Sequence, residues 1–298
     1  MSFLSVRNLT LRLKNGPRLL RRVSLDVAPG EVRGLVGESG AGKSMIGKAI
    51  LGILPGAVEI AEGEIWLDGT DLLSLPPTER RRRIGATAAL IPQDPLTALN
   101  PSHRIGPQIT DRLVHILGWS RTDATARALD LLAEVHIPDP ERVMRNYPHE
   151  LSGGMRQRIL IASAFAAEPK LIVADEPTTA LDVTVQKQIL RLIAGMQARH
   201  QTALLFVTHD LGVVSKVCQR LTVLYSGMVV EDASVTDFFA APRHAYSAAL
   251  LAATPKYTDP AAGLLPVPET VTASVRAEVE AFDRAMDSAI NERGLADG

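Results

Sequence analysis

Apolar and polar residues alternate near the start of the chain with the two-residue period of β-strands. The alternation runs over residues 3–13 and 23–28, and the turn-forming triplet Asn15-Gly16-Pro17 stands between these stretches. Residues 63–68 (GEIWLD) have the pattern of a further strand. Because successive strand side chains point to opposite faces of a sheet, we expect half-buried strands here, the first two joined by a turn.

Shorter runs that are apolar throughout alternate with helical patterns over most of the remaining chain. Such runs are typical of buried strands, and their alternation with helices predicts crossovers between parallel strands, with ligands at the strands' carboxyl ends. We expect strands at 32–36, 87–91, 171–174, 203–207 and 221–225, and helices at 43–53, 182–199, after Pro76-Pro77 and after Asp210.

Two further segments have a helical pattern. From about residue 95 to 148, apolar side chains recur at helical spacing, as at Leu113, Ile116 and Leu117. After a proline-rich stretch through Pro268, an amphipathic helix is expected, and packing on its own domain is favoured for it over an interface role. Its apolar stripe consists of Val271, Val275, Val279, Phe282, Met286 and Ile290.

Composition narrows the class of protein. The chain has 298 residues, 46% of them apolar, which suffices for one large core or one core with a small appendage. Its 32 Lys and Arg nearly balance 33 Asp and Glu, unlike the basic surface of a nucleic-acid binder. Cys218, the only cysteine, leaves no internal disulfide and no four-cysteine metal or iron–sulfur site.

Hydropathy bears on where the protein works. The start of the chain lacks the apolar core of a secretory signal, and no run approaches the roughly 20 apolar residues that span a bilayer. We therefore expect a soluble, cytosolic protein that reaches a membrane only through a partner.

Residues 37–44 (GESGAGKS) match the phosphate-binding pattern G-x-x-x-x-G-K-S/T and stand between a predicted buried strand and a predicted helix. Glycines let backbone N–H groups close around phosphate oxygens, and the helix N-terminus adds partial positive charge. Lys43 is expected at the β and γ phosphates of a nucleotide, and Ser44 at Mg²⁺. The predicted nucleotide contacts in this segment are Gly37, Glu38, Ser39, Gly40, Ala41, Gly42, Lys43, Ser44 and Met45.

The strand predicted at 171–174 runs into two carboxylates, Asp175 and Glu176. Asp175 can hold Mg²⁺ through water, and Glu176 can polarise an attacking water as a general base. An Asp-Glu pair after a strand is common, and its place downstream of the phosphate-binding segment is what favours this interpretation.

Four further features look like the motifs of ABC ATPases, in the family's order. They are Gln93 of a Q-loop (IPQDP), the signature LSGGMRQR at 151–158, the D-loop TALD that ends in Asp182, and the H-loop histidine His209 (VTHD). The resemblance covers residues 3–255.

This resemblance implies an α/β fold of the P-loop NTPase class. Its parts are a parallel core sheet, an N-terminal antiparallel β subdomain and a helical signature subdomain inserted at about 95–160. The ATPase domain would span 1–253. Residues 254–298 would form a short C-terminal extension, made of a linker and the amphipathic helix.

The family mechanism implied for the chain places two ATP molecules head to tail between two ATPase subunits. Ser152, Gly153 and Gly154 would meet the γ-phosphate that the partner's P-loop holds. His209 would contact the γ-phosphate and steady Glu176. Gln93 would serve both catalysis and Mg²⁺, and Asp182 would belong to the nucleotide site.

A narrower resemblance links the chain to oligopeptide and dipeptide importer ATPases. It rests on PQDPLTALNPSHRIGPQI, DEPTTALDVTVQ and APRHAYSAALLAATP at 241–255. It implies ATP-driven peptide uptake through two transmembrane permeases, fed by an extracytoplasmic solute-binding protein, at the cytoplasmic face of a bacterial inner membrane. Met155 in the signature resembles one of two non-identical ATPases in such importers, so a second ATPase is expected. Nickel or another small solute is the alternative cargo.

The sequence departs from the family pattern at three places. Leu13 occupies the position where an aromatic residue usually stacks on adenine, Met155 stands in the signature where many relatives have Gln, and the tail lacks the cysteine cluster that many relatives carry. A soluble ABC ATPase acting on DNA or the ribosome ranks lower, because the chain has neither a long coiled-coil insertion nor a second cassette. A GTPase would need an Asn-Lys-x-Asp motif, which is absent.

Overall fold

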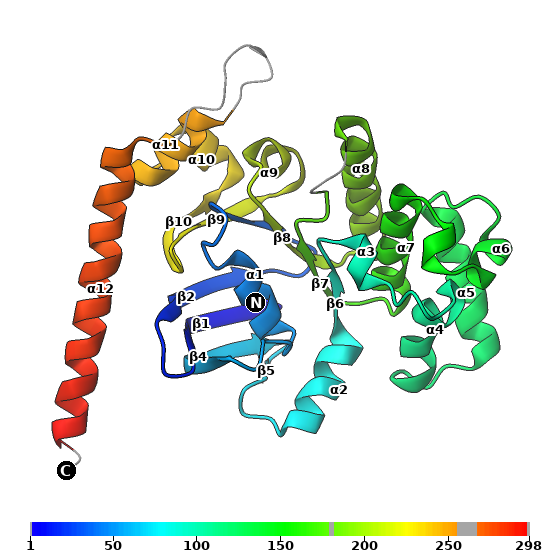
Figure 1. The fold of residues 1–298 in the computed structure, drawn as a ribbon, viewed down its shortest axis with the longest axis horizontal. Helices are drawn as coiled ribbons and strands as arrows, with labels where there is room; N and C mark the ends of the chain where they lie inside the picture. Colours follow the sequence, from blue (N-terminus) through cyan, green and yellow to red (C-terminus); the bar gives the residue numbers. More distant parts are fainter. Residues whose placement is uncertain (1, 179–181, 255–266, 297–298) are drawn as a thin grey trace.

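The computed structural model describes residues 2–178, 182–254 and 267–296, which form two β-sheets with helices around them (Figure 1). The first sheet is antiparallel, in the order β2-β1-β4-β5. Its strands are β1 (Leu4–Leu13), β2 (Arg18–Val27), β4 (Val58–Leu67) and β5 (Thr70–Asp71). The strands predicted at 23–28 and 63–68 are therefore longer at their N-terminal ends than the sequence pattern indicates.

The second sheet has the order β10-β9-β3-β8-β7-β6, and all neighbours are parallel except β10 and β9. The five predicted buried strands are confirmed, and β10 is an addition that the apolar pattern did not indicate. The strands are β3 (Val32–Val36), β6 (Ala88–Ile91), β7 (Leu171–Asp175), β8 (Ala203–Thr208), β9 (Arg220–Tyr225) and β10 (Met228–Ser234).

Four helices of the core are found where they were expected: α1 (Lys43–Ile50), α2 (Pro77–Thr87), α8 (Val183–His200) and α9 (Leu211–Val217). A fifth, α7 (Gly153–Ala166), begins in the signature segment and precedes β7. The segment after β6 forms a separate helical group beside α7 (Figure 1). This group contains α3 (Pro95–Ala98), α4 (Ile105–His115), α5 (Arg121–Glu134), α6 (Pro140–Arg145) and a 3₁₀ turn (Pro148–Glu150).

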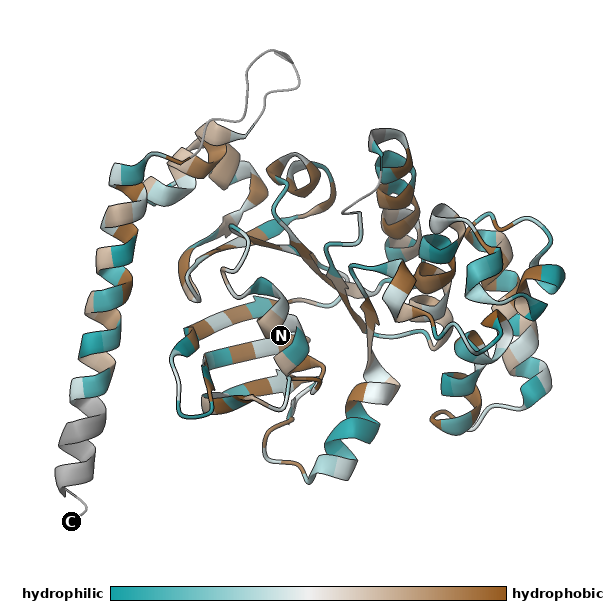
Figure 2. Cartoon of the chain, viewed as in Figure 1, coloured by the Kyte–Doolittle hydropathy of each residue, from teal (hydrophilic) through white to brown (hydrophobic). Residues whose placement is uncertain are grey.

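Two hydrophobic cores hold the layers together. One lies between the antiparallel sheet, α1 and one face of the parallel sheet, and includes Leu35, Ile46 and Val173. The other joins the opposite face of the parallel sheet to α8, α9 and the helical group, and includes Phe206 and Phe165. Figure 2 shows the strands of the parallel sheet as largely hydrophobic, as burial on both faces requires.

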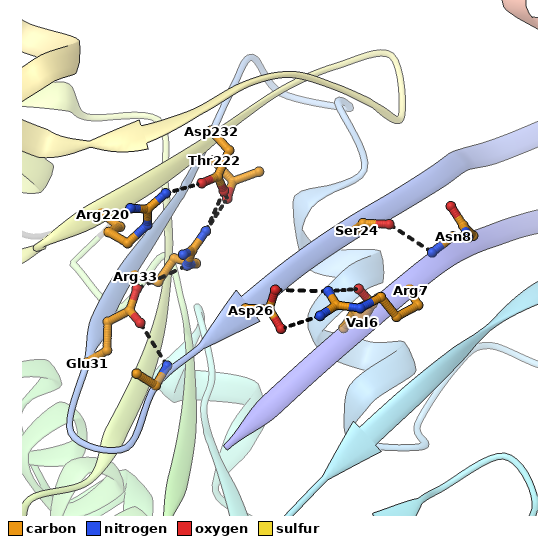
Figure 3. A network of polar contacts seen from close by, with 11 residues as sticks. Val6, Arg7, Asn8, Ser24, Asp26, Glu31, Arg33, Arg220, Thr222 and Asp232 are labelled. Atoms are coloured by element: carbon orange, nitrogen blue, oxygen red, sulfur yellow. Dashed lines mark hydrogen bonds and ion pairs between the residues drawn. The ribbon is translucent and has the colours of Figure 1, made fainter. Parts of the chain in front are cut away.

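The buried guanidinium of Arg33, on β3, links this strand to β9 and β10 (Figure 3). β3 is the strand that leads into the P-loop. The Arg33 side chain is 5% exposed and pairs with Asp232 and with Glu31. Its guanidinium also donates to Thr222, and Arg220 pairs with Asp232 at 2.7 Å. A guanidinium with this many acceptors offsets the cost of its burial, so the network holds the three strands in register.

The C-terminal segment continues from β10 as α10 (Val235–Ala240) and α11 (Ala245–Ala253), which contact β10, and then as α12 (Glu269–Ala296), which runs beside β10 and β2 (Figure 1). The predicted amphipathic helix is confirmed: Val275, Val279 and Met286 are buried on it. The side chain of Ile290 and most of the proline-rich stretch, residues 255–266, lie outside what the structure describes.

None of the helices in the described residues is long and apolar enough to span a bilayer.

Candidate active site

The register of the parallel sheet places three strand ends side by side. Val36 is paired with Thr208, and Asp175 is paired with Val207. The P-loop follows β3, Glu176 follows β7 and His209 follows β8, so all three reach the carboxyl edge of the sheet, where ligands of such folds bind.

The P-loop (residues 37–42) needs glycine at its two ends. Gly37 has φ +153°, and a Cβ there would lie 2.3 Å from the carbonyl oxygen of Leu224. Gly42 has φ +97°, and a Cβ there would lie 2.6 Å from the Leu20 side chain. The second glycine is also the N-cap of α1 and provides no side-chain cap, so the first N–H groups of this helix point toward the loop. The result is a backbone cradle suited to an anion.

Lys43 lies across this cradle. Its Nζ donates to the carbonyl oxygens of Gly37 at 2.7 Å and Glu38 at 2.8 Å, and the residue is buried. Burial lowers the pKa of the Lys43 ammonium, while the charges of Glu176, Asp175 and Glu38 act against this. An ammonium in this position can exchange a carbonyl for a phosphate oxygen.

Ser44 and Asp175 meet although 131 positions separate them, with the Ser44 hydroxyl donating to Asp175 Oδ1 at 2.8 Å. Burial raises the pKa of Asp175; the Ser44 hydrogen bond opposes the rise, and the charge of Glu176 adds to it. Two hard oxygens beside a second carboxylate form a donor set that fits Mg²⁺, because a cation relieves the carboxylates' repulsion.

Glu176 is held between two polar side chains. Gln93 Nε2 donates to one of its carboxylate oxygens at 3.3 Å, and His209 Nδ1 lies 3.3 Å from the other. The residue has φ +45°, and its backbone N–H donates to the carbonyl of Val207 at 2.9 Å. The structure thus brings Gln93, Asp175, Glu176 and His209 together at one edge.

The signature residues lie apart from this cluster. Ser152 is the N-cap of α7, where its hydroxyl accepts from the N–H of Met155 at 3.3 Å, and Gly153 and Gly154 form the first turn. Ser152 and Gly153 are exposed, and no hydrogen bond in the described residues joins them to the P-loop. Asp182 caps α8 by accepting from the N–H groups of Thr184 and Val185. Thr179, Ala180 and Leu181 of the D-loop lie outside the described residues.

The remaining residues of the predicted set surround the loop. Glu38, Ser39 and Gly40 are exposed, Met45 is partly buried on α1, and Ala41 is buried with its carbonyl accepting from Gly227.

Two residues of this region were not among the predictions. Gln157 is buried on α7 and donates to the carbonyl of Pro177, so it ties the signature helix to the loop after Glu176. Tyr246, on α11, is fully buried beside the P-loop residue Glu38. Gln157 falls inside the segment that resembles the signature, and this is the one signal that could have indicated it.

Comparison of the sequence with known proteins identifies the family to which this site belongs. Residues 20–179 match the family model described as "ABC transporter". The "Probable peptide ABC transporter ATP-binding protein y4tR" of Sinorhizobium fredii is 51% identical over 80% of this chain and 71% of its own length. The "Probable D,D-dipeptide transport ATP-binding protein DdpD" of Escherichia coli is 48% identical over 85% of this chain and 77% of its own length.

Solved structures agree with the fold. CbiO1 from Clostridium perfringens, part of the ABC transporter complex cbiONQ, superposes with a TM-score of 0.70 at 25% identity, over 80% of this chain and 91% of that protein. The ATP-binding cassette MJ0796, in a dimeric post-hydrolysis state bound to ADP and Pi, gives 0.68 at 26% identity, over 78% and 98%. This chain therefore belongs to the ATP-binding, ATP-hydrolysing subunits of ABC transporters, which work in complexes with permease components.

Proposed function

We propose that this chain hydrolyses ATP to drive peptide uptake through partner permeases in a bacterial importer. The observation that supports hydrolysis best is the Glu176 carboxylate, held between Gln93 and His209 beside the Ser44–Asp175 pair. The cargo class rests on the two relatives at 51% and 48% identity, whose names refer to peptide and dipeptide transport.

In this proposal, the P-loop and Lys43 bind the phosphates of ATP, and Ser44, Asp175 and Gln93 hold Mg²⁺. When bound, the ion neutralises charge on the phosphate oxygens. Glu176 takes a proton from the attacking water at a carboxylate oxygen, and its two neighbours keep that carboxylate aimed. His209 is 60% exposed, which leaves its ring open to a γ-phosphate on the solvent side.

The catalytic role of Glu176 has a direct test in the substitution Glu176→Gln. Turnover should fall about 10² to 10⁴ fold, the usual worth of a general base, while MgATP binding stays intact. Glu280→Gln, an exposed glutamate on α12, is the matched control and should leave turnover unchanged. Wild-type turnover of the Glu176 variant in the assembled transporter would exclude this role.

The cargo can be tested in cells that carry either the native chain or Lys43→Ala. Uptake of labelled di- and tripeptides should be lost with the variant, whereas uptake of labelled Ni²⁺ should persist. The opposite pattern would support the alternative of a nickel importer.

We also propose the division of the chain and its partners. Residues 1–253 form the ATPase domain, residues 254–298 form an extension packed on it, and a second, non-identical ATPase completes the motor. Two permeases place it at the cytoplasmic face of the inner membrane, and an extracytoplasmic binding protein delivers the cargo.

Docking on the permease is assigned to the helical segment at about 95–148. Leu96, at the start of α3, is 63% exposed and comes three residues after Gln93, so a partner seated there would sense the active site. Ile116, also exposed, belongs to the same segment. Cross-links from the permease should reach this segment, and cross-links that reach only β1 and β2 would refute the assignment.

A further inference from the structure

The segment at 241–255 lies outside the motifs of the active site, yet it brings one side chain next to the P-loop. Tyr246 is the second residue of α11 and is 0% exposed. Its ring packs edge-on against Tyr225, the last residue of β9, with 4.9 Å between ring centroids. The residue before Tyr225, Leu224, is the one whose carbonyl approaches Gly37, so Tyr246 lies close to the first turn of the loop.

The hydroxyl of Tyr246 is a buried group without a partner. It lies beside the backbone and carboxylate of Glu38, but it makes no hydrogen bond of ordinary geometry to any residue that the structure describes. Burial raises the pKa of this hydroxyl, and the charge of Glu38 raises it further, so the group keeps its proton as a donor. An unpaired buried donor is costly, and its persistence calls for a reason.

The donor is held by a rigid frame. The Glu231 carboxylate accepts from the N–H groups of Arg243 at 2.9 Å and His244 at 3.0 Å, which fixes the start of α11. The ring of His244 accepts from the N–H of Tyr246 and contacts Glu278 of α12 at 3.3 Å. Tyr246 is therefore tied to both β10 and α12.

The acceptor, in contrast, can move. The side chain of Glu38 is exposed, and the carbonyl of Glu38 accepts from Lys43 Nζ at 2.8 Å. The Lys43 ammonium has three N–H donors and two of them are used on carbonyls, so contacts with both the β and the γ phosphate would displace at least one carbonyl. Such an exchange leaves Glu38 free to shift against the fixed tyrosine.

We propose that Tyr246 is a positioning residue for the P-loop, whose hydroxyl donates to Glu38 once nucleotide phosphates occupy the loop. The inference rests on the proposed nucleotide site. In this proposal α11 contributes to nucleotide binding without contacting the nucleotide, because the hydrogen bond of Tyr246 stabilises the nucleotide-bound form of the P-loop.

The test uses the full-length protein and two measurements, MgATP affinity by calorimetry and the melting temperature without nucleotide. Tyr246→Phe should weaken MgATP binding about fivefold, the worth of one ordinary hydrogen bond. Its melting temperature without nucleotide should stay the same or rise, because the variant removes an unpaired buried hydroxyl. Tyr225→Phe is the matched control: the Tyr225 hydroxyl donates to the carbonyl of Thr272, away from Glu38, and the MgATP affinity of the variant should equal that of the native chain.

Glu38 supplies an independent variant at an exposed position. Glu38→Ala should lose the same factor in affinity, Glu38→Gln should retain most of it, and adding Tyr246→Phe to Glu38→Ala should cost nothing more. Native affinity in Tyr246→Phe, or full additivity of the two changes, would overturn the proposal. So would a loss of affinity that only follows a fall in melting temperature, which is the signature of packing alone.

Lys43→Ala separates this inference from the proposed site. If that variant binds MgATP as the native chain does, the P-loop assignment fails. If it does not bind while Tyr246→Phe keeps native affinity, only the inference about Tyr246 fails.

Discussion

At the scale of single residues, Leu13 occupies the position at which we expect the base of the nucleotide to be covered. It ends β1, its N–H donates to the carbonyl of Pro17 at 3.1 Å, and its side chain is partly buried against the core of the antiparallel sheet. An aliphatic side chain offers no ring face for stacking, so Leu13→Tyr should tighten ATP binding by about 1 kcal/mol. Calorimetric titration measures the gain, with Ile116→Tyr as the control at a distant exposed site. Absence of a gain would mean that another side chain already covers the base.

Glu231 offers a prediction about pH. Burial by itself raises the pKa of this carboxyl, but the hydrogen bonds from the backbone N–H groups of Arg243 and His244 help to outweigh it, and the net pKa lies below the ordinary value. A group with a lowered pKa in the folded state adds stability above its unfolded pKa and loses it as the pH falls through the folded value.

The substitution Glu231→Gln should therefore lower the free energy of unfolding by about 1 kcal/mol at pH 7. The difference from the native chain should shrink below pH 4.5 and vanish once the native carboxyl is protonated. Urea denaturation at a series of pH values gives the comparison. A difference that is the same at every pH would show that the charge of Glu231 contributes nothing.

Residues of the candidate site differ in how far the sequence could indicate them. Ser44 and Asp175 could be predicted, because each belongs to a motif at the carboxyl end of a strand and parallel strands bring such ends together. Tyr246 could not, because its neighbour Glu38 is 208 positions away and the contact depends on how α11 crosses the sheet. The segment at 241–255, which resembles importer ATPases, includes Tyr246 but does not indicate which residue its hydroxyl faces.

At the scale of elements, α12 is tied to β2 by ion pairs. Arg21 makes a two-pronged contact with Asp283, at 2.9 and 2.7 Å, and donates to the carbonyl of Ser226 at 2.6 Å. Arg18 pairs with Asp287 at 2.6 Å. The residue after Ser226, Gly227, donates to Ala41 of the P-loop, so this contact links α12 to the edge of the active site.

Asp283→Ala should lower the free energy of unfolding by about 1 kcal/mol, because Arg21 is only 12% exposed and its pair with Asp283 is less screened than a surface pair. Glu280→Ala is the matched control on the same helix: its contact with Arg284 is long and exposed, and the change should be too small to measure. Thermal melting together with hydrogen exchange over residues 18–27 reports the effect. Equal behaviour of the two variants would show that the ion pair does not hold α12.

At two places the sequence pattern missed a strand segment that contains charged residues: β10 and the first half of β2. β10 includes Glu231 and Asp232, and two adjacent carboxylates in a sequence indicate a loop. In the folded chain Glu231 binds the start of α11, and Asp232 pairs with both Arg33 and Arg220. The first half of β2 is similar: Arg22 pairs with Glu62 across the sheet. By contrast, α12 could be predicted because its apolar stripe follows from the helical period alone.

At the scale of the whole molecule, the P-loop and the signature segment do not meet within the part of the chain that the structure describes. Ser152 and Gly153 are exposed at the start of α7, and no hydrogen bond in the described residues connects them with Lys43 or the P-loop. The fold class and this separation were both expected from the resemblance to ABC ATPases, which implies a signature in an inserted helical subdomain that faces a partner's P-loop. The order of the strands was not, since it depends on which crossover packs on which face.

The last prediction is that activity requires a second chain that supplies the missing half. In a head-to-tail pair, each ATP would contact the P-loop of one subunit and the helix N-terminus at Ser152 to Gly154 of the other, where exposed N–H groups suit an anion. The isolated chain should therefore hydrolyse ATP slowly, and turnover should rise steeply with the concentration of the partner, because docking completes both sites at once.

Met155 points to a non-identical partner. Ser152→Ala in this chain should impair the site whose P-loop lies on the partner, whereas Lys43→Ala should impair the other. Co-purification with the permeases measures the composition directly, and a complex with two copies of this chain and no second ATPase would overturn the prediction.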